Sequence, residues 1–327
     1  MKRREFITLV GGAALARPQA ARAQQPATPV IGFLHTATSE SYAAMAAGFR
    51  QGLKQTGYVE GENVAIEYRW AENHSDRLAA MAADLVRRRV AVILAGGNSD
   101  ASLAAKAATS TIPIVFVHGS DPVKMGLVAT FNRPGGNLTG VSFLVSALGP
   151  KQLELLHELV PTAAVIAMLV DPGAPTGDDQ VKGVQAAAQA IGRQVLVLNA
   201  GSERDIDGAF ATAVQSKAGG LLVSADAFYR SRYRQLVALA AHHAMPAIYP
   251  WREAAAAGGL VSYGASLTEA YHQAGIYAGR ILKGEKASDL PVVQSTRVEL
   301  VINLKTAKTL GLTFPITLLG RADEVIE

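Results

Sequence analysis

The sequence predicts an α/β protein made of two doubly wound parallel-sheet lobes joined by a multi-segment hinge. Strand-like and helix-like segments alternate from Pro29 onward. Segments such as 90–95 and 112–117 are continuous apolar runs, which are typical of parallel strands covered by helices on both faces. The same order of elements returns after residue 165, which indicates a second lobe of similar design.

Each lobe is expected to follow a repeated strand–helix pattern. In the first half, apolar residues recur at helical spacing from Tyr42 to Leu53, and Gly57 is a good helix stop. The distances from Val30 to Gly57 and from Val165 to Gly192 are both 27 residues. We expect first-lobe strands at 30–34, 64–68, 90–95 and 112–117, with helices at 77–88 and 98–109. We expect second-lobe strands at 165–170, 194–198, 220–224 and 246–249, with helices at 178–191, 205–216 and 231–243.

The later segments must connect these two lobes. Residues 133–143 are rich in Pro, Gly, Asn and Thr and are expected to form a crossover or hinge. A helix is expected at 267–282, a strand at 297–302 and a short helix at 304–310. The predicted division is an N-terminal lobe of 29–140 plus 267–290 and a C-terminal lobe of 141–266 plus 291–327.

The N-terminal residues 1–23 have the composition of an export signal. A basic head with Arg3-Arg4 precedes an apolar stretch that is too short to span a bilayer, and Ala21-Arg22-Ala23 resembles a signal-peptidase site. We therefore expect export to the periplasm and cleavage before Gln24. The arginine pair followed by Phe6 favours the twin-arginine route, and the general secretory route is the alternative.

Removing that segment changes the charge of the chain. The whole chain has 31 Lys+Arg and 27 Asp+Glu. Residues 1–23 hold five of the cations and one of the anions, so the rest carries 26 of each. Nucleic-acid binders carry a surplus of cations, so we expect no nucleic-acid partner. The chain has no cysteine, so we expect neither disulfides nor a lipid anchor, and we expect a monomer held together by its apolar core.

Candidate ligand-binding residues follow from the rule that open parallel sheets bind ligands outside the carboxyl ends of their strands. The loops at those ends are 35–42, 96–100, 118–121, 171–176, 224–228, 249–252 and 262–266. Their Ser, Asn, Asp, Gly and aromatic residues suit a small polar ligand with an apolar body. The residues selected are Ser39, Gly97, Asn98, Ser99, Asp121, Asp171, Asp226, Trp251 and Tyr263.

For an amino-acid ligand, the two charged groups have specific candidate partners. Its carboxylate is expected at the helix N-termini after Gly97 and Ser39, where Ser39 and Ser99 hydroxyls would assist. Its ammonium is expected between Asp121 and Asp226 on facing lobes. Plain structural roles stay open: the two serines and Asp226 would also serve as helix caps, Asp121 as a turn former, and the aromatic residues as packing.

No sequence motif indicates catalysis. The chain has no GxSxG elbow, Walker loop or HExxH pattern, and Gly96-Gly97-Asn98 lacks the full dinucleotide fingerprint. We therefore expect no catalytic residues, no cofactor and no metal.

Several stretches resemble bacterial ABC transporter substrate-binding proteins of the tryptophan or aromatic-amino-acid-binding type, which have the type I periplasmic binding fold. They include GFRQGL at 48–53, AATSTIPIVF at 107–116, RPGGNLTGVS at 133–142 and LVINLK at 300–305. The resemblance covers essentially the whole chain after the export segment. It implies a two-lobed clamp that captures a small solute and delivers it to a membrane permease. We rank an amino acid or related small carboxylate first, an aromatic one within that class, and sugars second. An exported enzyme or a ligand-sensing module on the same fold are the alternative functions.

Overall fold

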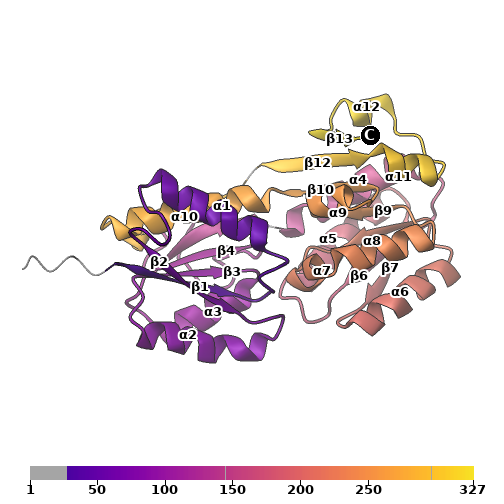
Figure 1. The fold of residues 1–327 in the computed structure, drawn as a ribbon. Coiled ribbons are helices and arrows are strands. Elements are labelled where there is room, and N and C mark those ends of the chain that lie inside the picture. The colour runs from indigo at the N-terminus through magenta and orange to yellow at the C-terminus, as the bar shows by residue number, and fades with distance from the viewer. Residues whose placement is uncertain (1–27, 144, 296) are drawn as a thin grey trace, which may run out of the picture.

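The computed structural model describes residues 28–143, 145–295 and 297–327, which fold into two α/β lobes lying side by side (Figure 1). The predicted fold class is confirmed: each lobe has a mostly parallel sheet with helices on both faces. The expected export segment, 1–23, lies outside the described residues.

The N-terminal lobe contains a six-stranded sheet in which every strand pair is parallel. Its central strands are fully buried because helices cover both faces, as their apolar sequences predict. The strand order is β11-β5-β4-β3-β1-β2. The strands are β1 (Val30–His35), β2 (Ala65–Trp70), β3 (Val92–Gly96), β4 (Ile114–His118), β5 (Leu138–Ser142) and β11 (Val293–Gln294).

Helices α1 (Ala43–Gln55) and α10 (Leu267–Leu282) cover one face of this sheet, and α2 (Leu78–Arg87) and α3 (Ser99–Ala108) cover the other (Figure 1). Although α1 and α10 are far apart in sequence, they pack in direct backbone contact. A Cβ at Gly52 would collide with the carbonyl oxygen of His272, and one at Gly275 with that of Phe49. These glycines therefore allow the close approach that joins α10 to the N-terminal lobe.

The C-terminal lobe contains a seven-stranded sheet in the order β13-β12-β10-β9-β8-β6-β7. Only the pair β10–β12 is antiparallel among the described strands. The strands are β6 (Val165–Val170), β7 (Gln194–Asn199), β8 (Gly220–Val223), β9 (Ala247–Tyr249), β10 (Val261–Ala265), β12 (Val298–Asn303) and β13 (Glu324–Ile326).

The helices of the C-terminal lobe also lie on both faces of its sheet. Side chains of α4 and α5 share one core cluster with β12, and side chains of α6 and α8 contribute to another. None of the described helices is long and apolar enough to cross a membrane. The helices are α4 (Gly149–Leu159), α5 (Gly177–Ala190), α6 (Glu203–Gln215), α7 (Ala227–Ser231), α8 (Tyr233–His242), α9 (Arg252–Ala256), α11 (Leu304–Thr309) and α12 (Ile316–Leu319).

Three chain segments pass from one sheet to the other: those after β5, after β10 and after β11. The predicted division at 140 falls inside β5, and the predicted division at 290 falls just before β11. Because β5 and β11 pair within the N-terminal sheet, that sheet extends a few residues beyond each of these two predicted divisions. The predicted helix at 267–282 is found with the same bounds.

The local expectations fail in several places, including the expected strand-end loop 262–266, most of which is the strand β10. The stretch 133–143 was predicted to be a hinge, but it contains β5, which is buried between β4 and β11. No helix was expected at 149–159, where α4 forms with Pro150 in its first turn. The helix expected at 231–243 is found as α8, and a further short helix that was not expected, α7, precedes it behind the capping carboxylate of Asp226.

Candidate functional site: a cavity between the lobes

A small cavity lies where the carboxyl ends of the strands of both lobes face each other. This is the position that open parallel sheets provide for ligands. The N-terminal lobe supplies residues before α1, after β3 and after β4, and the C-terminal lobe supplies the loops after β6, β8 and β9. The lining residues are Tyr42, Gly97, Asn98, Gly119, Ser120, Phe143, Val145, Pro175, Thr176, Ala225, Asp226, Ala227, Trp251 and Leu267.

Asp226 is the only carboxylate among these lining residues, and no basic side chain lines the cavity. Its Oδ1 accepts a hydrogen bond from the backbone N–H of Phe228 at 2.7 Å and caps α7. Burial, together with the nearby Asp171 carboxylate, raises the pKa of Asp226 to about 6, and the Phe228 N–H partly opposes this rise. A partly buried, desolvated carboxylate such as this one is stabilised by a cation on the ligand, and none of the described lining residues supplies a cation.

A second group of acidic residues surrounds the adjoining mouth of the cavity. Asp171 lies there, near Asp226 and Asn98. Its Oδ1 accepts a hydrogen bond from Gly173 N–H at 2.9 Å, and burial raises its pKa. Asp76 and Asp100 of the N-terminal lobe line the same mouth. The mouth is therefore negative, which attracts cationic groups and repels anionic ones.

Aromatic and aliphatic side chains form the apolar wall of the cavity. Tyr42, Trp251 and Leu267 are 3%, 6% and 8% exposed, and Phe143 is half-buried beside them. The Tyr42 ring packs on His35, with 4.1 Å between ring centroids. Burial and the nearby Arg230 lower the pKa of His35 to about 3, so this ring is neutral. The wall suits an apolar or aromatic ligand body.

The N-terminal lobe also offers backbone donors. Within the described part of the chain, the N–H groups of Gly119 and Ser120 donate no hydrogen bond. Asn98 is the cap of α3, and its Oδ1 accepts from Asp100 N–H at 3.0 Å, so the positive end of a ten-residue helix lies at the cavity. These groups are suited to an anionic ligand group.

The structure brings four of the predicted site residues into the cavity: Gly97, Asn98, Asp226 and Trp251. Asp171 lies at its mouth. Gly97 has a φ of +98° and donates its N–H to the Tyr271 hydroxyl at 3.1 Å, so this donor is already occupied.

The other four predicted residues lie away from the cavity lining. Ser39 is exposed, and α1 begins at Ala43, so Tyr42 takes the position expected for Ser39. Ser99 is fully buried, and its hydroxyl has no partner in the described residues. Asp121 accepts hydrogen bonds from Val123 and Lys124 N–H groups, which is the turn-forming role. Tyr263 packs against the core of the C-terminal lobe.

Several lining residues were not selected from the sequence. Tyr42, Gly119, Ser120 and Thr176 belong to the strand-end loops that the sequence analysis named, so the strand-end rule located them without singling them out. Phe143 and Leu267 lie on the segments that cross between the lobes. Apolar residues on a crossover give no chemical signal in the sequence, so only the fold places them at the site.

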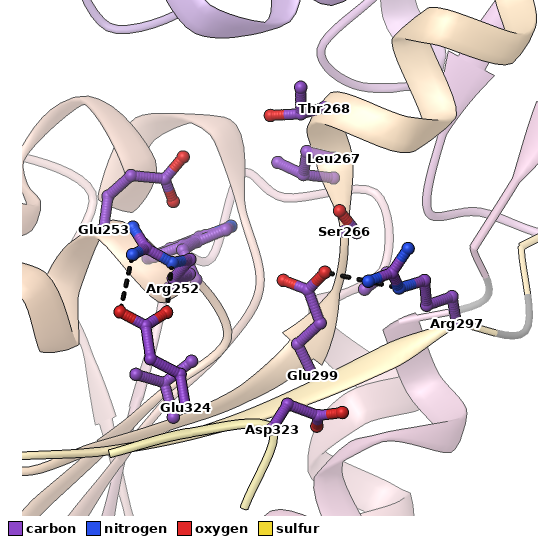
Figure 2. Close-up of a pocket in the computed structure, with 12 residues that line it drawn as sticks. Arg252, Glu253, Ser266, Leu267, Thr268, Arg297, Glu299, Asp323 and Glu324 are labelled. Atoms are coloured by element: carbon purple, nitrogen blue, oxygen red, sulfur yellow. Dashed lines mark hydrogen bonds and ion pairs between the residues drawn. The ribbon is translucent and has the colours of Figure 1, made fainter. Parts of the chain in front are cut away.

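A second, more highly charged pocket lies behind Trp251 and Leu267, which line both spaces. Figure 2 shows its charged side chains around Ser266 and Thr268, where the chain enters α10. Arg252 donates two hydrogen bonds to Glu324 at 2.7 Å, and Arg297 lies 3.6 Å from Glu299. Because these charges are paired with one another, this pocket is a weaker candidate for the ligand site.

Comparison with known proteins identifies the class. The family profile described as ABC transporter substrate binding protein matches residues 31–326, so the chain belongs to this family. The protein is therefore an extracytoplasmic, non-enzymatic binding component of an ABC transporter. The alternative of an exported enzyme is excluded.

Two relatives bear on the ligand. The chain is 28% identical over 265 residues to the "Tyrosine-binding protein" of Clostridioides difficile (strain R20291), covering 81% of this chain and 76% of that protein. It is 27% identical to an ABC domain from Streptococcus pneumonia in complex with L-Trp, with a TM-score of 0.83 over 91% of this chain and 100% of that one.

Another solved structure is described as open. The ligand-free, open structure of a substrate binding protein with adhesive properties from Clostridium difficile is also 27% identical and also covers 91% of this chain and 99% of that one. Its TM-score is only 0.67. At equal identity, the chain thus matches the structure of the L-Trp complex better than the open structure.

Proposed function

We propose that this binding protein captures an L-amino acid with an aromatic side chain. The observation that carries the proposal is the composition of the cavity: one partly buried carboxylate, a set of backbone N–H donors and an apolar aromatic wall. An amino acid has one cation, one anion and one apolar body, which fits these three features. The relatives described as tyrosine-binding and as an L-Trp complex support the same class.

Asp226 is the proposed partner of the ligand ammonium. One of its oxygens is engaged by Phe228 N–H, and the carboxylate lies in the cavity beside the negative mouth. A charge-assisted hydrogen bond to an ammonium would contribute about 1.5–3 kcal/mol. The rival Asp121 is used by its own turn.

The ligand carboxylate is proposed to bind on the opposite lobe. Gly119 and Ser120 have N–H groups that are unused in the described residues, and the N-terminus of α3 lies beside them. Backbone donors and a helix N-terminus stabilise an anion without a basic side chain. The ligand would then span the cleft, with its charged ends on different lobes.

The ligand ring is proposed to lie among Tyr42, Phe143, Trp251 and Leu267. Two of these side chains lie on segments that pass between the lobes: Phe143 on the first crossing and Leu267 on the second. A ring that fills the space between them would contact both lobes and the hinge, and so favour closure.

The site of action and the partner follow from the same proposal. The export segment 1–23 supports delivery to the periplasm through the twin-arginine route, and family membership supports a membrane ABC permease as the partner. Replacing Arg3 and Arg4 by lysine tests the route: export should be blocked, and unchanged export would indicate the general pathway.

Isothermal titration calorimetry with the mature protein tests the ligand class. We expect L-tryptophan, L-tyrosine or L-phenylalanine to bind more tightly than L-leucine, L-aspartate and a monosaccharide such as D-glucose. The apolar wall should favour the aromatic amino acids, and the negative mouth should repel aspartate. Tight binding of a sugar with no binding of aromatic amino acids would contradict the proposal.

A further inference from the structure

Arg230 is a charged residue buried between the lobes but outside the ligand cavity. It lies on α7 of the C-terminal lobe and is only 2% exposed. Its two terminal nitrogens donate to the two carboxylate oxygens of Glu253 on α9, at 2.7 and 2.8 Å. Both partners belong to the C-terminal lobe, so this ion pair does not itself connect the lobes.

The cover over this ion pair comes from the other lobe. The Arg230 guanidinium carbon lies 5.5 Å from the centroid of the Tyr42 ring, and Nη2 lies 3.5 Å from Met45 Sδ. Tyr42 and Met45 are at the start of α1, and Tyr42 is held in the N-terminal lobe by its packing on His35. When the lobes separate, Tyr42 and Met45 must leave, and this face of the guanidinium becomes exposed to water.

Closure therefore changes the hydration of Arg230 and leaves its pairing intact. The bidentate contact between Arg230 and Glu253 lies within the C-terminal lobe, so it can form whether the two lobes are open or closed. In the closed arrangement Nε is buried and has no partner in the described residues, so it loses a hydrogen bond to water. A cation–π contact returns part of this loss, but removing a guanidinium from water generally costs more than such a contact returns.

We infer that Arg230 is a brake on closure: it makes the empty clamp costly to close, and a ligand beside Tyr42 offsets that cost. Arg230 is thus a positioning residue that sets affinity without touching the ligand. The link to affinity rests on the proposed function, whereas the effect on the empty clamp does not. The interlobe hydrogen bond from Asn73 to Ser231, at 3.3 Å, is only partly buried, and a single bond of this kind contributes too little to hold the empty clamp shut.

The distance between the lobes in the ligand-free protein tests the brake directly. The chain has no cysteine, so Ala79→Cys on α2 and Ala211→Cys on α6 place two spin labels at exposed positions on different lobes. In Arg230→Met combined with Glu253→Gln, which removes both charges, we expect the closed fraction without ligand to rise about tenfold. Pulsed dipolar spectroscopy reports both populations.

The lysine variant separates a brake from ordinary packing. Arg230→Lys keeps the charge but presents a more strongly hydrated ammonium without the planar fork. A brake predicts opposite signs: the Met/Gln variant closes more and the lysine variant closes no more than the parent protein. If Arg230 merely fills space, both variants should have a smaller closed fraction than the parent protein. That result would overturn the inference.

Affinity for L-tryptophan gives the second readout. The apparent dissociation constant is the intrinsic one divided by the competent fraction, so the Met/Gln variant should bind about tenfold more tightly. Arg280→Met combined with Glu285→Gln is the matched control, because Arg280 lies 5.7 Å from the centroid of the Tyr277 ring and pairs with Glu285 within the N-terminal lobe. It should change neither readout. Weaker binding by the Met/Gln variant, with an unchanged closed fraction, would also contradict the brake.

The two proposals can fail separately. If L-tryptophan does not bind the parent protein, the proposed ligand class is wrong, but the ligand-free distances still decide the role of Arg230. Should the Met/Gln variant fail to fold by circular dichroism, the lysine variant still decides: a closed fraction above that of the parent protein would overturn the inference.

Discussion

The two lobes share one architecture, but their cleft faces differ in how they present polar groups. The C-terminal face presents a side-chain carboxylate, Asp226, with Asp171 close behind it at the mouth. The N-terminal face presents backbone N–H groups at Gly119 and Ser120 and the start of α3. Two lobes of similar fold thus offer a carboxylate for a cation on one face and backbone N–H groups for an anion on the other.

This difference determines which experiments affect which face. A side-chain charge is removed by a single substitution, whereas a backbone N–H survives almost any substitution. The C-terminal face is therefore tested by mutating the protein, and the N-terminal face is tested by changing the ligand.

The largest effect is expected for Asp226→Asn. Asparagine still caps α7 but cannot pair with an ammonium, so affinity for the bound amino acid should fall about 10- to 100-fold. Titration calorimetry measures this loss. Asp121→Asn is the matched control on the opposite lobe and should leave affinity unchanged, since Asp121 does not line the cavity. Equal losses in both variants would restore the original assignment of Asp121.

Ligand analogues combined with this variant separate the two faces. Indole-3-propionate lacks the ammonium and tryptamine lacks the carboxylate of L-tryptophan. Each should bind the parent protein about tenfold or more weakly. In Asp226→Asn the penalty for indole-3-propionate should largely disappear, while the penalty for tryptamine remains, since the N-terminal donors are intact. A penalty for indole-3-propionate that is unchanged by the substitution would place the ammonium elsewhere.

Raising the pH through 6 should increase the affinity for the ligand and decrease the stability of the ligand-free protein. The pKa of Asp226 is raised to about 6 by burial and Asp171, so the carboxyl is neutral below that pH and loses the ligand cation. Affinity should be about tenfold lower at pH 5 than at pH 8. In the ligand-free protein, the charged form opposes folding, so Asp226 should cost stability above pH 6 and less as the pH falls through 6.

The matched measurement compares the parent protein with Asp226→Asn. Calorimetric titrations and urea unfolding at pH 5 and pH 8 report both quantities. The variant should lack the pH dependence of affinity, and its advantage in free energy of unfolding should be larger at pH 8. An affinity that stays constant in the parent protein between these pH values would refute Asp226 as the titrating partner.

The smallest effect is expected for Ser120→Ala. Ser120 lines the cavity, but the proposed donor is its backbone N–H, which alanine keeps. Affinity should change by less than about threefold by calorimetry. A loss as large as that of Asp226→Asn would show that the N-terminal face also binds through a side chain.

The fold was predictable because its signals are local. Continuous apolar runs such as 90–95 and 112–117 appear as the buried strands β3 and β4, and the helix at 267–282 is found as predicted. The failures occurred where tertiary context overrides composition. Residues 138–142 contain Gly and Thr yet form β5, because strands on both sides supply its hydrogen bonds.

The lining of the candidate cavity was predictable to the level of loops but only partly to the level of residues. The strand-end rule located Gly97, Asn98, Asp226 and Trp251 because strand order alone fixes where loops meet. Ser39 and Asp121 were polar residues in the right loops, but local turns placed them outside the cavity. Sequence cannot decide this, because the direction of a side chain in a loop depends on backbone angles that distant contacts fix.

The sequence by itself determined the alternation of strands and helices, the two-lobed class, the balance of charge after residue 23 and the loops that carry the site. Only the tertiary structure decided that Phe143 and Leu267 join the cavity wall and that Arg230 is sealed beneath Tyr42. These residues lie far apart along the chain. Their side chains are removed from water only where the two lobes come into contact, so their effect on binding depends on the tertiary structure.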